Sequence, residues 1–236
     1  MKLIAVIPCY KVGFKINSLV KKTLNYVDGL IVVDDFCPLN TGKFVQKKFL
    51  KNKKVLVIKN KKNLGVGGAV IKGYRQAIKF SPDFIVKLDG DGQMNPKYIK
   101  KFKLQAMKSN ADYIKGNRFF FSKELMKMSL IRLIGNIFIS FLGKISTGYW
   151  KIFDFSNGYT FVRTKVLKKI NLSKVKTNYF FETDLLFQLS SVHAHVLDIN
   201  IPAKYTNIKS NLKIWKVAHY FLIFNILNFF KRILKY

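Results

Sequence analysis

The sequence is poor in acidic residues, in arginine and in cysteine, and each shortage narrows the functions that it can have. Asp and Glu together number 12, against 43 Lys and Arg, so the formal net charge is +31. Such a charge attracts phosphate-rich partners and anionic membrane surfaces, although lysines spread along a whole chain also fit a plain bias on solvated faces. Nearly all of the excess is lysine, whereas base readout favours arginine, so no specific nucleic-acid partner is expected. Cys9 and Cys37 are too few for a disulfide framework or a cysteine zinc site, and they fit a reducing compartment.

We also expect neither a leader peptide nor a membrane-spanning segment. Residues 1–8 run directly into a strand pattern without a cleavable apolar stretch. Charged residues interrupt the apolar segment 125–145, and the apolar run 220–224 is far shorter than the roughly 20 residues of a membrane span. We therefore expect a cytoplasmic protein that binds the cytoplasmic face of the membrane peripherally.

What the sequence does contain is an alternation of strand and helix patterns. Short apolar runs predict strands at 2–7, 30–33, 55–58 and 84–88, and amphipathic spacing predicts helices at 15–26, 41–50, 68–80 and 96–107. Further strands are expected at 113–115, 159–162 and 196–199, with helices at 164–170 and 181–192. This order predicts an α/β fold with a mostly parallel, doubly wound sheet in one main domain, residues 1–205.

Two segments differ from this pattern. Segment 125–145 combines Met, Leu, Ile and Phe with basic residues, which fits either an interfacial membrane helix or a helix packed on the sheet. The tail, residues 206–236, mixes aromatic residues with lysines and predicts one or two amphipathic helices at the bilayer interface. Docking of the tail on a partner protein is the alternative.

Asp89 and Asp91 are the most informative residues of the chain. A strand that ends on Asp-x-Asp projects both carboxylates near the carboxyl edge of the sheet, where open α/β sheets place ligands. Oxygen ligands of this kind suit Mg²⁺ or Mn²⁺ carrying substrate phosphates. The alternative is an ordinary solvated turn, because two acids that bracket a glycine also favour one.

Asp34 and Asp35 end another predicted strand and would share this edge with Asp89, where one carboxylate can accept hydrogen bonds from a ribose or a base. Segment 63–69, Asn-Leu-Gly-Val-Gly-Gly-Ala, precedes a helix, and its glycines permit close backbone approach to a ligand. It lacks the Gly-Lys-Ser/Thr ending of a Walker loop and the GxGxxG spacing of a dinucleotide site, so neither site is predicted.

In this order the motifs resemble those of the family 2 glycosyltransferases with the GT-A fold. The likeness covers roughly residues 1–205 and rests on segments 6–10 (VIPCY), 32–35 (VVDD), 63–69 (NLGVGGA), 89–93 (DGDGQ), 116–119 (GNRF), 154–159 (DFSNGY) and 180–186 (FFETDLL). Within the family, the chain looks most similar to the polyprenyl-phosphate sugar transferases of the dolichyl-phosphate mannosyltransferase type. The Gln-x-x-Arg-Trp motif of processive members is absent.

The resemblance implies an inverting transfer of a sugar from a nucleotide-diphosphate sugar to a polyprenyl phosphate or a glycolipid. The donor-binding positions that it implies are Pro8, Tyr10, Asp34, Asp35, Asn63, Gly65, Gly68 and Asp89. Asp91, with Asp89 and Gln93, would hold Mg²⁺ or Mn²⁺ on the diphosphate and so neutralise charge on the leaving nucleotide.

On the acceptor side, the resemblance implies that Arg118 and Arg132 face phosphate groups, which a bidentate guanidinium suits. Glu182 and Asp184 match an acidic motif where family 2 enzymes often have a catalytic base. A hydroxyl acceptor needs such a base, whereas a polyprenyl phosphate is already an anion and does not. Asp184 also fits a plain helix-start carboxylate, and Asp154 with Asn157 fits either turn chemistry or substrate contact.

Departures from the family pattern leave several questions open. Residues 36–41, Phe-Cys-Pro-Leu-Asn-Thr, stand where the family commonly has a small residue, a serine and a further acid, so the nucleobase is open. Many polyprenyl-phosphate members continue into transmembrane helices, so we expect either peripheral membrane binding or a shortened relative. The alternatives are transfer to a saccharide in polysaccharide or lipopolysaccharide assembly, and a non-catalytic module that binds polyanions or membranes.

Overall fold

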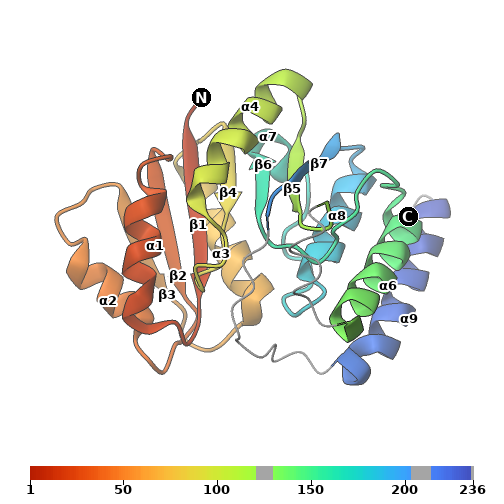
Figure 1. Cartoon of the computed structure of the whole chain (residues 1–236), viewed down its shortest axis with the longest axis horizontal. Coiled ribbons are helices and arrows are strands. Elements are labelled where there is room, and N and C mark those ends of the chain that lie inside the picture. Colours follow the sequence, from red (N-terminus) through yellow and green to blue (C-terminus); the bar gives the residue numbers. More distant parts are fainter. Residues whose placement is uncertain (121–129, 203–213, 235–236) are drawn as a thin grey trace.

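A seven-stranded mixed sheet runs through the middle of the molecule in the computed structural model, which describes residues 1–120, 130–202 and 214–234 (Figure 1). The strands are β1 (Leu3–Cys9), β2 (Gly29–Asp34), β3 (Val55–Lys59), β4 (Phe84–Lys87), β5 (Tyr113–Asn117), β6 (Thr160–Arg163) and β7 (Val196–Asn200). Their order across the sheet is β3-β2-β1-β4-β6-β5-β7.

Most neighbouring strands are parallel. β1 pairs in parallel with β2 and β4, β2 with β3, and β5 with β7, whereas β6 is antiparallel to both β4 and β5. The predicted α/β fold with a mostly parallel sheet is therefore confirmed. Because β6 runs the other way, its first residue lies at the edge where β4 and β5 end.

Helices cover both faces of the sheet because each buries one apolar stripe. In α1, for example, Ile16, Leu19, Val20 and Thr23 are buried at helical spacing. One face is covered by α1 (Ile16–Thr23), α2 (Thr41–Lys48) and α4 (Ile99–Ser109), and the other by α3 (Gly65–Lys79), α7 (Thr164–Leu167) and α8 (Phe181–Ser191). Short 3-10 turns, η1 (Gly13–Lys15) and η2 (Pro96–Tyr98), precede α1 and α4.

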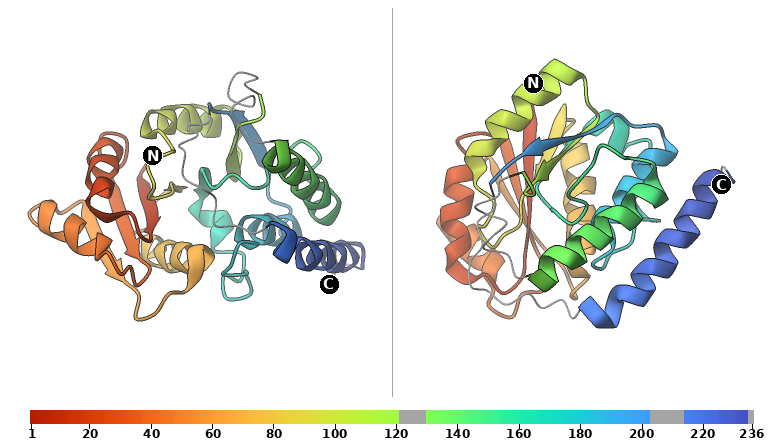
Figure 2. Two further views of the ribbon diagram at one scale, coloured as in Figure 1. Left: turned by 60° about the horizontal axis from the view of Figure 1, so that its bottom comes forward. Right: turned by 45° about the vertical axis from the view of Figure 1, so that its right-hand side comes forward.

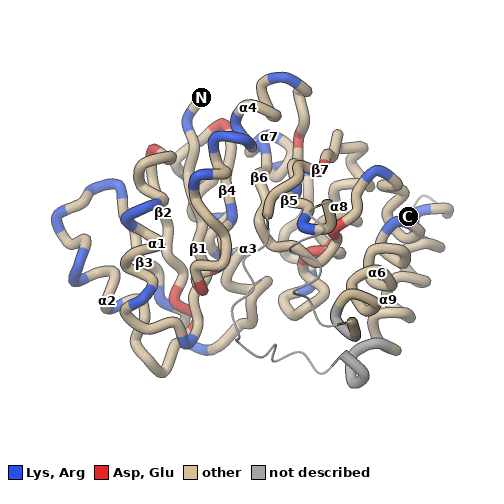
Figure 3. The backbone as a smooth tube through the Cα atoms, viewed as in Figure 1, with Lys and Arg blue, Asp and Glu red and all other residues tan. Residues whose placement is uncertain are grey.

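Two further helices, α6 (Leu130–Thr147) and α9 (Ile214–Ile233), pack side by side beyond the β7 end of the sheet (Figures 1 and 2). They fall in the two segments that the sequence sets apart, although residues 125–129, 206–213 and 235–236 of those segments lie outside the described part. Basic residues stand in the last turn of each helix, and most of the remaining length is uncharged in Figure 3. None of the described helices has both the length and the hydrophobicity that crossing a bilayer requires.

Candidate active site

The carboxyl edge of the sheet brings the two acidic pairs together. Asp34 ends β2, and Asp89 follows β4 by two positions. Both strands flank β1 in parallel, so these residues leave the sheet on either side of the end of β1. The structure thus places the predicted donor acids at one edge, as the alternation of strands and helices indicates.

The side chain of Asp34 makes hydrogen bonds within the protein. Its carboxylate is buried and accepts the backbone N–H groups of Cys37 at 2.7 Å and Gly42 at 2.6 Å. A Cβ atom on Gly42 would lie 2.7 Å from Oδ2 of Asp34, so only glycine fits there. Asp34 therefore holds the loop before α2 against β2, with both oxygens engaged.

Asp35 differs from Asp34 because only one of its carboxylate oxygens makes hydrogen bonds within the described residues. Its Oδ1 accepts hydrogen bonds from Nδ2 of Asn60 at 2.7 Å and from the backbone N–H of Leu64 at 2.9 Å. Among the described residues, no hydrogen bond reaches its Oδ2. Asp35 thus anchors the segment before α3 and retains one carboxylate oxygen for a ligand.

The turn that carries Asp89 and Asp91 packs against the end of β1. The backbone N–H of Gly90 donates to the carbonyl of Pro8 at 3.2 Å, and a Cβ atom on Gly90 would lie 2.8 Å from the same oxygen. Tyr10, just past β1, is 43% exposed. Pro8 therefore positions the acidic turn through its backbone, and Tyr10 leaves an aromatic surface beside it.

Asp89 and Asp91 are the residues that would hold a divalent ion. Asp91 is exposed and accepts the backbone N–H of Gln93 at 2.9 Å, while the side chain of Asp89 is one-third exposed. Desolvation within the turn and the nearby charge of Asp89 raise the pKa of Asp91. No group of three or more His, Cys, Asp or Glu in the described part of the chain forms a closed metal cluster. Two carboxylates fit Mg²⁺ or Mn²⁺ that takes its remaining ligands from water and substrate phosphates.

The glycine-rich segment before α3 receives another part of the chain. The N–H groups of Gly67 and Gly68 point to the carbonyl of Thr177, at 2.9 and 3.3 Å. Gly65 has φ +78°, and a Cβ atom on it would lie 2.8 Å from that same carbonyl. Asn63 accepts the N–H of Gly65 at 2.9 Å. The close approach that these glycines permit is made by the segment leading into α8, and contact of Asn63, Gly65 and Gly68 with a donor stays a prediction.

A buried lysine joins the donor-side acid to the acceptor-side acid. Nζ of Lys87, in β4, lies 2.8 Å from Oδ1 of Asp89 and 2.9 Å from Oε1 of Glu182, in α8. Lys115, in β5, is also buried and lies 3.5 Å from Oε2 of Glu182. Burial opposes the charge on Lys87, but Asp89 and Glu182 together raise its pKa above the usual range, whereas burial lowers the pKa of Lys115.

Neither lysine was among the predicted site residues. The sequence feature that could identify Lys87 is its position inside an apolar strand. It follows Phe84-Ile85-Val86 and precedes a buried leucine. A lysine in that position must find an anion inside the protein.

Glu182 and Asp184 separate in space although they share the first turn of α8. Oδ2 of Asp184 accepts the backbone N–H of Lys176 at 2.7 Å, and burial raises its pKa. Asp184 therefore braces the segment before its own helix, while Glu182 faces Lys87 and Lys115.

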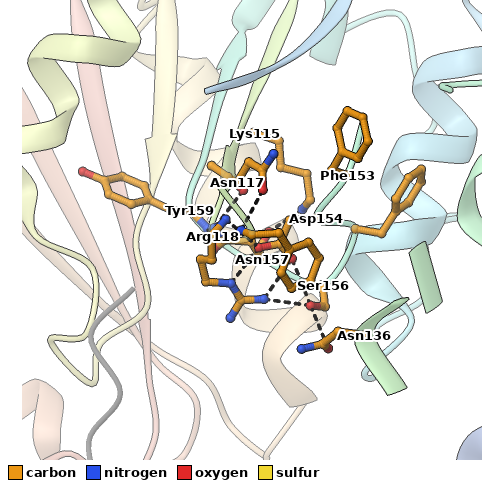
Figure 4. Close-up of polar contacts among 12 residues, drawn as sticks. Lys115, Asn117, Arg118, Asn136, Phe153, Asp154, Ser156, Asn157 and Tyr159 are labelled. Atoms are coloured by element: carbon orange, nitrogen blue, oxygen red, sulfur yellow. Dashed lines mark hydrogen bonds and ion pairs between the residues drawn. The ribbon is translucent and has the colours of Figure 1, made fainter. Parts of the chain in front are cut away.

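Arg118 is held in one orientation by a neighbouring loop (Figure 4). Its Nε and Nη2 donate to Asp154 at 2.7 and 2.9 Å, and Nη2 also donates to Ser156 at 2.8 Å. Burial opposes the charge of Asp154, but Arg118 outweighs it and lowers the pKa of that carboxyl. Ser156 donates in turn to Asn136 of α6 at 3.1 Å. The side chain of Arg132, also in α6, lies outside the described part of the chain.

Asn157 ties the same loop to β5. Its Nδ2 donates to the carbonyl of Gly116 at 2.8 Å, its Oδ1 accepts the N–H of Tyr159 at 3.1 Å, and its carbonyl accepts from Nζ of Lys115 (Figure 4). Of the two alternatives for Asp154 and Asn157, the turn contacts are present, and contact with a substrate stays a prediction.

Asp198, in β7, is a half-buried residue whose carboxyl has an incomplete set of hydrogen-bond partners. Its Oδ2 accepts the N–H of Phe153 at 2.6 Å, and its Oδ1 is buried without a hydrogen-bond partner in the described structure. Burial raises the pKa of Asp198 to about 7. It is the register partner of Lys115, so the charged cluster continues to the last strand of the sheet.

Comparison with known proteins gives a family match over most of the chain. The model of the family "Glycosyl transferase family 2" matches residues 4–171. The UDP-N-acetylglucosamine–dolichyl-phosphate N-acetylglucosaminyltransferase of Methanococcus voltae is 30% identical over 70% of this chain and 71% of its own length. The undecaprenyl-phosphate mannosyltransferase of Micrococcus luteus is 25% identical over 85% of this chain and 83% of its own length.

Among solved structures, the fold is similar to glucosyl-3-phosphoglycerate synthase from Mycobacterium tuberculosis in complex with Mn²⁺, UDP and phosphoglyceric acid. The TM-score is 0.68 at 14% identity, over 96% of this chain and 77% of that chain. At this identity the likeness concerns the fold, and it supports the GT-A-like architecture.

Asp198 gives a prediction about pH. Because its pKa is raised in the folded state to about 7, folding takes up a proton, so stability is fully present below pH 4 and falls as the pH rises towards 7. Asp198→Asn, which keeps an acceptor for the N–H of Phe153, should remove this fall and be more stable than the unaltered chain at pH 8 by up to about 4 kcal/mol, since a difference of one pKa unit is worth about 1.4 kcal/mol. Urea unfolding of both proteins at pH 4, 6 and 8 measures this, and an identical pH slope in the two would contradict it.

Proposed function

The chain belongs to glycosyl transferase family 2, and we propose that it transfers a sugar, with inversion, from a nucleotide-diphosphate sugar to a polyprenyl phosphate or a related glycolipid at a membrane surface. Relatives at 25–30% identity whose names specify dolichyl-phosphate and undecaprenyl-phosphate sugar transfer support this acceptor class. The edge with Asp35, Asp89 and Asp91 supports a nucleotide donor.

On the donor side, Asp35 would accept a hydrogen bond from the nucleoside through its remaining oxygen, next to Pro8 and Tyr10. Asp91 and Asp89 would hold Mg²⁺ or Mn²⁺, with Gln93 of the same turn as a further ligand. Bound there, the ion would neutralise charge on the diphosphate as it leaves. In the transfer, an acceptor oxygen forms a bond to the anomeric carbon from the opposite side, and the bond from that carbon to the diphosphate breaks.

The observation that carries the acceptor assignment is the set of contacts that the Glu182 carboxylate makes. Its two oxygens lie 2.9 and 3.5 Å from the ammonium groups of Lys87 and Lys115. Both oxygens of Glu182 are thus engaged by ammonium groups of the protein itself, so neither is left to take a proton from an acceptor hydroxyl. Asp184, the other candidate base, is turned to the backbone of Lys176. An acceptor that is already an anion needs no base, and a lipid phosphate meets this condition.

Arg118 would contribute a fixed positive group beside this acceptor. Asp154 and Ser156 set the plane of its guanidinium, and a guanidinium held in one plane suits a phosphate. Arg132 is proposed for the same phosphate on the family resemblance alone.

The pair α6 and α9 supports a lipid environment, because its polar side chains face inward. Asn225 and Asn228 of α9 are buried, and Oγ of Ser146 in α6 donates to Oδ1 of Asn225 at 2.8 Å. Small and polar residues between helices are typical of helix packing in membranes.

The outward face of this pair is apolar. Its exposed residues are Ile134, Ile137, Phe138 and Phe141 on α6, and Leu222, Ile223, Ile226, Leu227 and Phe230 on α9. A soluble helix pair has the opposite arrangement, with apolar residues in the seam and polar ones outside. Together with the net charge of +31, this face fits insertion into the interfacial region of an anionic bilayer.

The apolar face is also connected to the site. Asn136 lies in α6 between these exposed residues, and Ser156 links it to Arg118. A helix resting on the bilayer would therefore hold the phosphate-binding arginine at a fixed distance from the surface where a lipid phosphate lies.

For the donor, we expect UDP, GDP or dTDP to raise the melting temperature in the presence of Mn²⁺, since ligand at 100 times its Kd adds about 2.7 kcal/mol. Asp91→Asn should weaken this binding about tenfold or more, because one of two carboxylate ligands is lost. Asp28→Asn, at the opposite edge of the sheet, is the matched control. Stabilisation by the nucleotide that is independent of both Mn²⁺ and Asp91 would refute the donor site.

For the acceptor, we expect labelled sugar to pass to a short-chain polyprenyl phosphate. At saturating donor, Glu182→Gln should lower kcat less than about tenfold, because loss of a general base costs 10²–10⁴-fold. Transfer only to a saccharide hydroxyl, with a loss of a hundredfold or more in Glu182→Gln, would instead support the saccharide acceptor.

For the membrane, Phe141→Ser combined with Ile223→Ser should weaken cosedimentation with phosphatidylglycerol vesicles about tenfold or more, since each change removes an apolar side chain worth about 1.5–3 kcal/mol when buried. Leu104→Ser with Met107→Ser, two exposed apolar residues of α4, is the matched control and should not change it. If the α6 and α9 variant binds vesicles normally but no longer dimerises, the face is an interface between two copies.

A further inference from the structure

Four neighbouring strands place one row of polar residues across the sheet. Lys87 of β4 is the register partner of Thr160 of β6, Thr160 is the partner of Lys115 of β5, and Lys115 is the partner of Asp198 of β7. Register partners point to the same face of a sheet, so both lysines project under α8. The row therefore places two ammonium groups in the interior of the protein.

Burial makes these charges costly to the fold. Lys87 is 2% exposed and Lys115 is fully buried. A buried ion pair adds little net stability, because desolvation cancels most of the attraction. What such a pair does supply is a fixed relative position of the groups that it joins.

Lys87 occupies the centre of this arrangement. It contacts Asp89, which follows its own strand, and Glu182, which is 95 residues away in sequence. Its ammonium engages Oδ1 of Asp89, and among the described residues no hydrogen bond reaches Oδ2. The rotamer of Asp89 is thereby set with one oxygen left for a ligand.

Lys87 and its two acids fill the space beside Gly158, so that a side chain does not fit at this position. A Cβ atom on Gly158 would lie 2.2 Å from Nζ of Lys87, 3.0 Å from Oδ2 of Asp89 and 3.2 Å from Oε1 of Glu182. Any side chain at position 158 would therefore displace the lysine or one of its two acids.

We propose that Lys87 is a positioning residue, which fixes the donor-side carboxylate of Asp89 relative to the acceptor-side carboxylate of Glu182. The proposal rests on the proposed function, because it assigns Asp89 to the donor and Glu182 to the acceptor. Lys87 does not touch the reacting atoms. It acts through Asp89, whose free oxygen it directs towards the metal and the diphosphate.

The test compares two equally buried lysines. In Lys87→Met, binding of UDP or GDP with Mn²⁺ should weaken about tenfold or more. The reason is that a site loses metal affinity when the group that orients one of its metal ligands is removed. Lys115→Met removes an ammonium that binds Glu182 but not Asp89, and it should change the same Kd less than about threefold. Calorimetric titration gives the Kd, and urea unfolding reports the stability of each variant. Lys87→Gln is the second variant if Lys87→Met does not fold.

Glu182→Gln completes the test as a double-mutant cycle. If Lys87 joins the two acids, Glu182→Gln should add nothing to the loss of nucleotide affinity in Lys87→Met. Equal loss of affinity in both lysine variants, in proportion to their loss of stability, would reduce Lys87 to a structural residue and overturn the proposal. An unchanged Kd in Lys87→Met would overturn it too. If the unaltered chain binds none of UDP, GDP and dTDP, the proposed function itself fails, and this proposal falls with it.

Discussion

Two ammonium groups buried in the sheet must find carboxylates inside the protein, and this need joins the halves of the molecule. Lys87 belongs to the parallel strands of the donor side, and Lys115 belongs to the strands beyond β6. Both meet Glu182 of α8. The turn with Asp89, the loop with Gly158 and the first turn of α8 are consequently positioned by one set of charges. Charge pairing of this kind depends on every member, because a single unpaired charge in the interior is far more costly than the pair.

The sequence predicts the parts of the site that depend on strand ends. Asp34, Asp35 and Asp89 lie at one edge because parallel strands end at the same edge, and the alternation of strands and helices already indicates parallel strands. The same reasoning does not separate Asp34 from Asp35. Their roles differ because Asp34 turns to the N–H groups before α2 and Asp35 to Asn60 and Leu64, which are contacts of loops. Glu182 and Asp184 diverge for the same reason.

Pairings over long sequence distances are beyond pattern analysis. Nothing in the local sequence of Lys87 indicates that its partner lies 95 residues later. The glycines of segment 63–69 suggest a ligand, yet the carbonyls of Thr177 and Lys176 occupy the space beside Gly65 and Gly67. In α9, composition indicates an amphipathic helix, but only the packing on α6 shows that Asn225 and Asn228 face inward. In each case the deciding atom comes from a distant part of the chain.

The polar seam between α6 and α9 makes the strength of this helix pair depend on the medium around it. In water, solvent competes for Ser146 and Asn225 whenever the helices separate, so their hydrogen bond adds little. In a hydrocarbon environment that competition vanishes and the same bond is stronger. The helix pair is therefore expected to be weakest in detergent-free buffer and strongest where lipid or detergent surrounds it.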